Sequence, residues 1–298
     1  MINKGIKIFY RIFPHLFWQK YHQKARQLGI KKLSLTLSFD CDSDEDILAA
    51  QKIHQWLKVR GVMAVFAVPG YQLKKGQHVY RRLVGENAEF INHGALPHTI
   101  WKNNSYESIT FYHQMNSQII QDDIYQGHEI VTKIIGKEPK GFRAPHFGHF
   151  QKPHQINFLH SVLRSLGYHY DSSTEPNYAL KYGPYWRNND IIEIPVSGSF
   201  SSPLTTFDSW TYLISPSQLI LLNSYKNTFI KTIHNLQKLN ICGLLNYYVD
   251  PAHVQGDTSF FDAITFALEN GIEILSFSQW QNTVTNPLYK KLSSCAVL

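Results

Sequence analysis

Short apolar segments alternate along the chain with longer segments of helical periodicity, and this alternation restricts the possible folds more than any other feature. Strands joined by helical crossovers form parallel sheets, and about eight of them favour a barrel over an open sheet. The alternation therefore predicts an α/β fold, a (β/α) barrel of about seven or eight parallel strands. The strand-like segments cover 33–40, 62–69, 88–93, 140–147, 167–171, 191–196, 243–249 and 272–277, and the helical patterns 44–60, 106–136, 153–166, 216–240 and 258–270.

We expect a single barrel rather than two domains. The 298 residues are 43% hydrophobic, which is enough to bury one large core. The predicted barrel covers residues 32–281, with a basic amphipathic extension before it (1–31) and a tail after it (282–298). Segment 172–215 is long, aromatic and rich in turn residues, and loops of this kind inside a compact domain usually form lids or substrate walls.

The net charge of +7 raises the question of a nucleic-acid partner. Lysine and arginine gather in the first 32 residues and in scattered pairs elsewhere, and no nucleic-acid-binding motif accompanies them. We therefore expect no nucleic acid as partner. The three cysteines, Cys41, Cys242 and Cys295, are too far apart in the sequence to form a disulfide framework, which favours a reducing compartment.

The N-terminal extension interleaves apolar and basic residues without the uninterrupted apolar core and cleavage site of a secretory signal. No run of 18 apolar residues is present, so we expect no transmembrane helix and a cytoplasmic location. Two interpretations of the extension remain open. Its aromatic face packs on the barrel, or it rests weakly on an anionic membrane surface. The sequence does not indicate an oligomeric state.

Chemically active side chains follow the predicted strands, where β/α barrels build their active sites. The segment LSFDCDSDED (37–46) ends the first strand with Asp40 and Asp42. Ser43 to Asp46 fit a helix cap, but Asp40 still lies on the strand, and a buried charge needs a partner or a metal. Carboxylates and imidazoles suit Zn²⁺ and related ions. The other strand-end candidates are His93, His98, Arg143, His146, Asp171, Asp250 and His253.

Three segments resemble the first three motifs of the polysaccharide deacetylase family (NodB-homology domain, carbohydrate esterase family 4). They are SFDCD (38–42), EFINHGALPH (89–98) and FRAPHFG (142–148), in the family's order. A last strand followed by Gln279 and Trp280 resembles the end of the same domain, so the resemblance covers roughly residues 32–281. It implies a distorted barrel and metal-dependent hydrolysis of the N-acetyl group of an amino sugar or glycan precursor, in surface-polysaccharide metabolism.

The resemblance also implies roles for individual residues. Asp40 would act as the base on the attacking water, and Arg143 would orient Asp40. Asp42, His93 and His98 would hold the divalent metal, with zinc expected first and cobalt, nickel or manganese as alternatives. Because Cys41 takes the second place of the first motif, the ligand role passes to Asp42, as in the Asp-x-Asp branch of the family.

The sequence departs from the family pattern in two further places. The two histidines are five residues apart rather than four, and Gly94 follows the first. Asp250 stands where many members carry a histidine that protonates the leaving amine, so either His253 or an Asp250 of raised pKa is expected as the general acid. The residues expected to contact the sugar are Pro145, His146, Tyr185 and Trp186.

Two alternatives belong to other classes of function. One is hydrolysis of a different carbon–nitrogen bond, such as that of a cyclic amide, on the same fold. The other is a catalytically degenerate homologue that binds carbohydrate without hydrolysing it, which the altered histidine spacing and the missing late histidine favour.

Overall fold

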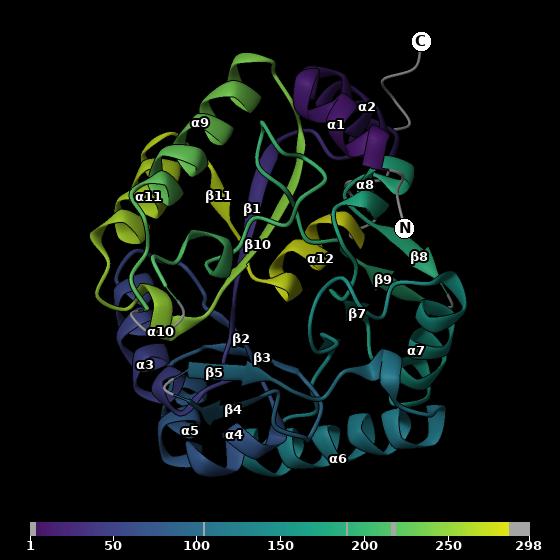
Figure 1. Ribbon diagram of the computed structural model, residues 1–298, viewed down its shortest axis with the longest axis vertical. Helices are drawn as coiled ribbons and strands as arrows, with labels where there is room; N and C mark the ends of the chain where they lie inside the picture. The colour runs from purple at the N-terminus through teal and green to yellow at the C-terminus, as the bar shows by residue number, and fades with distance from the viewer. Residues whose placement is uncertain (1–3, 104, 189, 216–218, 286–298) are drawn as a thin grey trace.

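The computed structural model describes residues 4–103, 105–188, 190–215 and 219–285. Its main sheet has the strand order β10-β1-β2-β3-β6-β7-β9-β8, with β11 paired to β1, and it curls into a half-barrel surrounded by helices (Figure 1). All of these strands pair in parallel except β8 (Trp186–Asn188), which runs antiparallel to β9. The distorted barrel is therefore confirmed. The parallel strands are β1 (Leu33–Asp40), β2 (Val65–Val68), β3 (Glu89–Asn92), β6 (Gly141–Phe142), β7 (Tyr170–Asp171), β9 (Ile191–Glu193), β10 (Gly243–Val249) and β11 (Glu273–Ile274).

Strands β1 and β10 form the longest pairing of the sheet, from Leu33 opposite Gly243 to Phe39 opposite Val249. Every residue of β10 and all but the first of β1 are buried, because helices cover one face and the barrel interior the other. This explains the near-continuous apolar character of both segments. Burying a side chain such as that of Phe39 stabilises the fold by roughly 2–3 kcal/mol.

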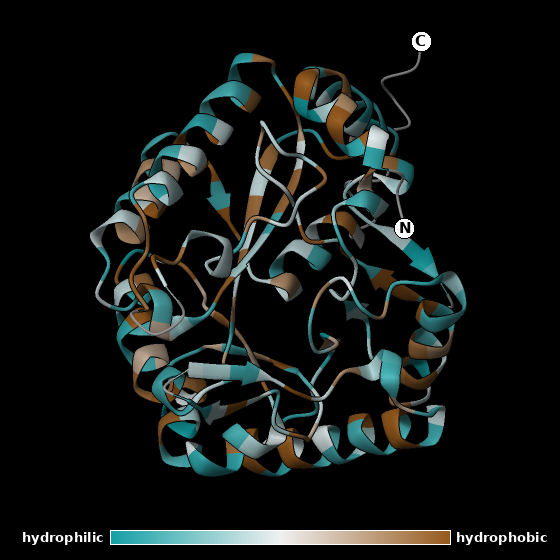
Figure 2. Ribbon diagram, in the orientation of Figure 1, coloured by the Kyte–Doolittle hydropathy of each residue, from teal (hydrophilic) through white to brown (hydrophobic). Residues whose placement is uncertain are grey.

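The outer helices turn their apolar faces toward the sheet, as Figure 2 shows by colour. The longest of them, α6, begins after Asn116, whose side chain accepts a hydrogen bond from the N–H of Ile119, and ends at Gly136 with φ +77°. The covering helices are α3 (Asp44–Lys58), α5 (Gln77–Gly85), α6 (Ser117–Ile135), α7 (Pro153–Ser165), α9 (Ser224–Lys238) and α11 (Thr258–Glu269).

The predicted helix 106–136 is wrong in its first third. Its opening residues belong to β5 (Ser105–Ser108), which pairs with β4 (Thr99–Lys102) in a separate hairpin, and to the 3₁₀ turn Tyr112–Gln114. The predicted lid 172–215 also contains regular structure: α8 (Asn177–Tyr182), β8, β9 and the 3₁₀ turn Trp210–Tyr212.

The N-terminal extension forms two helices that behave differently. Helix α2 (Pro14–Gln27) buries Phe17, Trp18 and Tyr21 against the barrel, and the Trp18 indole donates to the carbonyl of Phe200 at 3.1 Å. Helix α1 (Lys4–Ile12) buries only Tyr10. Among the described residues, no helix is both long enough and apolar enough to cross a membrane. Three shorter helices complete the described helical elements: α4 (Gly70–Lys75), α10 (Pro251–Val254) and α12 (Phe277–Thr285).

Candidate active site

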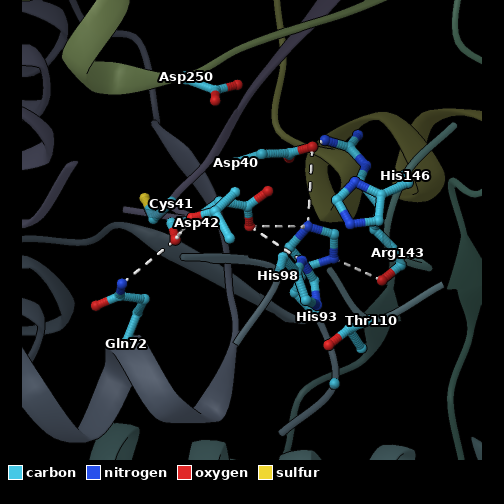
Figure 3. A network of polar contacts seen from close by, with 12 residues as sticks. Asp40, Cys41, Asp42, Gln72, His93, His98, Thr110, Arg143, His146 and Asp250 are labelled. Atoms are coloured by element: carbon cyan, nitrogen blue, oxygen red, sulfur yellow. Dashed lines mark hydrogen bonds and ion pairs between the residues drawn. The ribbon is translucent and has the colours of Figure 1, made fainter. Parts of the chain in front are cut away.

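Asp40 and Asp42 enter the same cavity because they lie two residues apart on extended backbone. Asp40 ends β1 opposite Ala67 of β2, and the N–H of Cys41 donates to the carbonyl of Ala67 at 2.9 Å, which continues the ladder by one residue. Successive side chains on extended backbone point to opposite sides. Cys41 is therefore fully buried in the core, whereas the two carboxylates line the cavity (Figure 3).

The rest of the acidic run belongs to the start of α3. The N–H and hydroxyl of Ser43 donate to Asp46 at 2.8 and 2.6 Å, and Asp44 pairs with Lys75 at 2.8 Å. The other oxygen of Asp46 accepts the N–H of Ala252 at 2.8 Å, so this carboxylate joins the start of α3 to the start of α10. The capping interpretation of Ser43 to Asp46 therefore holds, and it leaves Asp40 and Asp42 as the residues in need of another explanation.

Arg143 compensates the charge of Asp40. It follows β6, is completely buried, and places Nη1 2.5 Å from Oδ1 of Asp40. Its Nε and Nη2 donate to the carbonyl and hydroxyl of Ser172 at 3.2 and 3.1 Å, which fixes the plane of the guanidinium. Burial raises the pKa of Asp40 and Arg143 opposes this, and with Asp42 nearby the result is a pKa of about 6.

His93 and His98 meet Asp42, with ligand atoms of the three residues all within 4.8 Å of one another. Asp42 and His93 line the cavity, whereas His98 is completely buried beside them. His93 Nδ1 lies 2.7 Å from the Arg143 carbonyl, which requires the proton on Nδ1 and leaves the Nε2 lone pair facing the carboxylates. That Nε2 lies 3.6 Å from Asp42 and 3.9 Å from Asp40, too far for hydrogen bonds. His98 Nδ1 lies 3.0 Å from Asp42.

These residues fit a divalent cation. The Nε2 of His93 faces both carboxylates at distances beyond hydrogen bonding, and the Nδ1 of His98 faces Asp42 from 3.0 Å, so both imidazoles present a nitrogen to the same carboxylate. The Nε2 of His98 is buried without a hydrogen-bond partner among the described residues. The set of one carboxylate and two imidazoles is typical of catalytic zinc and related ions. Burial raises the pKa of Asp42, but the charges of His98 and His93 outweigh it and lower this pKa below the usual carboxyl value, so Asp42 stays ionised.

Asp123 of α6 holds the loop that carries the two histidines, and sequence reasoning missed it. This buried carboxylate accepts the N–H groups of Ala95 and Leu96 at 2.9 and 2.8 Å and the hydroxyl of Tyr112 at 2.6 Å. Gly94 has φ +77°, and a Cβ there would lie 2.3 Å from Asp123. Gly94 and the longer spacing between the two histidines are therefore both features of the loop that Asp123 holds. A carboxylate on the apolar face of a predicted helix was the available signal.

The cavity has a volume of about 360 Å³, and the other predicted residues are distributed unevenly around it. His146 lies in its wall with φ +56°, an unusual backbone conformation for a residue other than glycine. Pro145 is buried behind the wall. The cavity is lined by Asp40, Asp42, His93, Ser108, Phe111, His146, Phe147, His149, Glu175, Thr206, Asp208, Trp210, Tyr248 and Asp250.

Tyr185 and Trp186 do not reach this cavity, so the expectation that they contact its substrate is not met. Tyr185 packs edge-on against Trp280, and Trp186 stacks on Tyr182 with ring centroids 4.5 Å apart. Both line a separate groove beside Lys24 of α2. Their aromatic character serves the packing of segment 172–188 rather than the cavity.

The two candidates for the general acid occupy different positions. Asp250 follows β10, lines the cavity, and has a carboxylate oxygen without a hydrogen-bond partner. His253 lies behind it, with Nδ1 2.9 Å from the Ser209 hydroxyl and its ring against Trp210. Burial and the neighbouring carboxylates, Asp46 first, raise the pKa of Asp250 well above its ordinary value, whereas burial lowers the pKa of His253 to about 3.

Asp171 ends β7 but turns away from the cavity into a second buried cluster. Its Oδ2 lies 3.3 Å from His160 Nε2, which also lies 2.9 Å from Glu193. This cluster lies between α7, β7 and β9, and none of its three side chains is exposed.

Residues 27–170 match the family model described as polysaccharide deacetylase. No protein in the curated set matches the chain. The family match includes all three motifs on which the resemblance rested, and it ends at β7, before Asp250 and His253.

Solved structures of similar fold include a Mycobacterium smegmatis protein provisionally assigned as a polysaccharide deacetylase, with a TM-score of 0.65 at 17% identity over 87% of this chain and 92% of that one. The allantoinase PuuE has a TM-score of 0.59 at 11% identity, with coverages of 87% and 92%. A mutant of a carbohydrate esterase family 4 pseudoenzyme from Bacillus anthracis has a TM-score of 0.52 at 14% identity, with coverages of 83% and 66%. At these identities the likeness is one of fold.

Proposed function

From the membership of residues 27–170 in the polysaccharide deacetylase family, we propose that this chain is a metal-dependent deacetylase of an N-acetylated amino sugar or glycan precursor. The observation that carries the proposal is the cluster of Asp42, His93 and His98 beside an Asp40 held by Arg143, next to an open cavity. Surface-polysaccharide metabolism is the setting we propose. Because Cys41 and Cys242 are buried and form no disulfide within the part of the chain that the structure describes, we place the reaction in the cytoplasm.

Asp42, His93 and His98 would hold the metal, with zinc as the first candidate. A divalent cation bound there supplies Lewis acidity, which polarises the acetyl carbonyl and acidifies water. Nδ1 of His93 donates to the Arg143 carbonyl, so the lone pair of this ring lies on Nε2. The hydrogen bond thus fixes the orientation of the ring before any ligand binds.

Asp40 is the proposed base. A pKa of about 6 leaves it mostly ionised at neutral pH yet basic enough to take a proton from water. Arg143 orients the carboxylate through one oxygen, and Oδ2 faces His93 from 3.9 Å. The base therefore lies beside the proposed metal ligands and on the cavity side of them.

Asp250 is the proposed general acid. It lines the cavity and carries an oxygen without a hydrogen-bond partner among the residues that the structure describes, and burial with the neighbouring carboxylates raises its pKa well above the ordinary value. It can therefore donate to the departing nitrogen, so that the product leaves as an amine. His253 is neutral and is bonded to Ser209, so we assign it no proton transfer.

The lining of the cavity favours a sugar that carries no phosphate near the reacting group. Among the described lining residues are five carboxylates and neither lysine nor arginine, so a phosphate would meet repulsion there. Phe147 and Tyr248, whose ring centroids are 4.8 Å apart, offer aromatic surface for a sugar ring. His146, held by the carbonyl of Ile109 at 2.5 Å, is the proposed substrate contact from the third motif.

Hydrolysis of a cyclic amide is the second candidate, because the allantoinase shares the fold at a TM-score of 0.59. A degenerate binding protein is supported less, since the base, its arginine and all three proposed ligands lie together. The deciding experiment measures acetate release from a panel of N-acetylated sugars and ring opening of cyclic amides, after purification without chelator. We expect acetate release only.

The matched variants are Asp40→Asn and Asp44→Asn, which change the same side chain four residues apart. Asp40→Asn should abolish acetate release and keep the metal, because Asp40 is not among the proposed ligands. Asp44→Asn should have no effect, because that carboxylate pairs with Lys75 on the surface. Metal-loaded wild-type protein that opens cyclic amides and releases no acetate would replace the proposal by the second candidate, and inactivity on both panels would favour a binding protein.

A further inference from the structure

Helix α1 shows its apolar face to solvent, the reverse of what a helix packed on a domain does. Four large apolar side chains of the helix and Phe13 after it are each more than 40% exposed, and only Tyr10 is buried. The exposed fractions are 41% for Ile6, 53% for Ile8, 44% for Phe9, 63% for Ile12 and 42% for Phe13. The helix lies at the outer edge of the molecule, beside α2 (Figure 1).

Contacts with α2 fix this orientation. The ring of Tyr10 packs edge-on against Phe17, with centroids 5.8 Å apart, and Lys20 donates to its hydroxyl at 3.1 Å. Because α2 is itself tied to the barrel through Trp18 and Tyr21, α1 is held with its broad apolar face outward. The exposed face is therefore a feature of the folded chain.

Apolar and basic residues occupy separate arcs of α1. At 3.6 residues per turn, the four exposed apolar side chains of the helix fall within an arc of about 160°, and Lys4, Lys7 and Arg11 fall within an adjoining arc of about 60°. This arrangement, with a wide apolar face and a basic border, is the pattern of helices that lie in the plane of a membrane interface.

The charge of the chain is concentrated in the same region. The first 32 residues contain eight of the 29 basic side chains and none of the 22 acidic ones, the first of which is Asp40. The rest of the chain therefore carries 21 basic and 22 acidic side chains and is close to neutral. The first 32 residues thus carry a charge of +8 and the rest of the chain −1, which favours an anionic surface as the partner of α1, α2 and their flanks.

We propose that α1 docks the protein on an anionic lipid bilayer, with the exposed apolar side chains at the boundary of the acyl chains and Lys4, Lys7 and Arg11 among the phosphates. A second copy of the chain fits the face poorly, because pairing two such helices would bring two basic segments together. The inference does not rest on the proposed chemistry, since no residue of α1 lines the cavity.

The experiment is sedimentation of the full chain with vesicles of phosphatidylcholine alone, or of equal parts of phosphatidylcholine and phosphatidylglycerol. We expect binding to the anionic vesicles that weakens as salt is raised, and much weaker binding to the neutral ones. The double variant Ile8→Ser with Ile12→Ser should lower the partition coefficient about tenfold or more. Both side chains are exposed, so the thermal midpoint should not change.

Leu48→Ser with Val59→Ser is the matched control, because these side chains are 61% and 78% exposed on and just after α3. It should bind the vesicles as wild type does. The proposal is overturned if the chain ignores anionic vesicles, or if the control and the α1 variant lose binding equally. It is also overturned if light scattering shows a dimer that Ile8→Ser with Ile12→Ser dissociates, because a second copy would then cover the face.

Discussion

Two clusters of this molecule combine histidine with carboxylate at similar distances, yet they differ in what they leave unsatisfied. In the cavity cluster of Asp42, His93 and His98, one imidazole nitrogen has no partner and another is too far from its carboxylates to bond. In the second cluster, both nitrogens of His160 have partners: Nε2 lies 2.9 Å from Glu193 and Nδ1 lies 2.9 Å from the side-chain nitrogen of Asn188. The one buried atom of this cluster without a hydrogen-bond partner in the described ranges is a carboxylate oxygen of Asp171, 3.3 Å from His160. The two clusters therefore differ in their imidazole nitrogens, which are all used in the second cluster and partly unused in the first.

The second cluster is built to hold a proton. One oxygen of Glu193 accepts the N–H groups of Ser173 and Thr174 and the hydroxyl of Thr174, at 3.2, 3.0 and 2.7 Å. Burial lowers the pKa of His160, but Asp171 and Glu193 outweigh it and raise the value to about 9. Burial, reinforced by Asp171, raises the pKa of Glu193 to about 8. The cluster therefore joins α7 to the sheet as a protonated, internally bonded unit.

The largest expected difference between the two clusters is in metal content after one ligand-type residue is replaced in each. Asp42→Ala should lose the metal and lower acetate release roughly a thousandfold or more, because the Lewis acid is lost with it. His160→Leu should keep the metal of wild type. Elemental analysis of both variants, purified without chelator, checks this. Loss of metal from His160→Leu with its fold intact would contradict the distinction between the clusters.

The free energy of unfolding should show the opposite ranking, with the larger loss in the His160 variant. His160→Leu leaves Asp171 and Glu193 buried without their cation, and breaking a buried pair on one side costs about 3–5 kcal/mol. Denaturant unfolding of this variant beside Asp42→Ala measures the difference. We expect the cost for Asp42→Ala to be smaller, because the lost contact with His98 is offset by relief of the charge repulsion between Asp42 and Asp40. Equal costs would mean that both clusters are structural.

The two candidates for the general acid, Asp250 and His253, should differ in how much their replacement lowers kcat. Asp250→Asn should lower kcat about a hundredfold, the usual contribution of a positioned acid. His253→Gln should have a much smaller effect, since this residue is bonded to Ser209 behind the cavity. Steady-state acetate release at neutral pH measures both. The opposite ranking would transfer the acid role to His253.

The smallest expected effect is the dependence of stability on pH. The folded pKa values of about 9 for His160 and about 8 for Glu193 lie above their ordinary values of 6.5 and 4.5, so the folded state holds more protons than the unfolded state. Stability is then fully present at low pH and is lost as the pH rises through about 8 to 9. The thermal midpoint of metal-free protein should fall by several degrees between neutral pH and pH 9.5 or so, and His160→Leu should flatten this slope. A slope shared by variant and wild type would assign the titration elsewhere.

The parts of the fold that sequence predicts best are those whose own residues determine them. Strands β1 and β10 match their apolar runs residue for residue. Strands β6 and β7 retain only two residues each of the segments predicted for them, because their lengths depend on neighbours distant in sequence. The helix predicted before Ser117 is wrong for the same reason, because residues 105–108 pair with β4 instead of extending α6 toward the N-terminus.

The residues of the candidate site also differ in how well the sequence predicts their positions. Position at a strand end was enough to bring Asp40, Asp42 and Arg143 together, because parallel strands present their carboxyl ends to one edge. It was not enough for Asp171, which has the same local pattern but faces His160. Asp123 was missed because its partners lie in a loop far away in the sequence.

The pairing of β1 with β10 has a consequence for synthesis of the chain. Leu33 leaves the ribosome well before its neighbour Gly243, roughly ten to forty seconds earlier at usual rates of translation. During that interval one edge of an apolar strand stays open, and such edges recruit other chains. The carboxylates that end β1 are repulsive charges on this nascent edge. We therefore expect the carboxylates at the end of β1 to oppose pairing between unfinished copies of the chain until β10 has been synthesised.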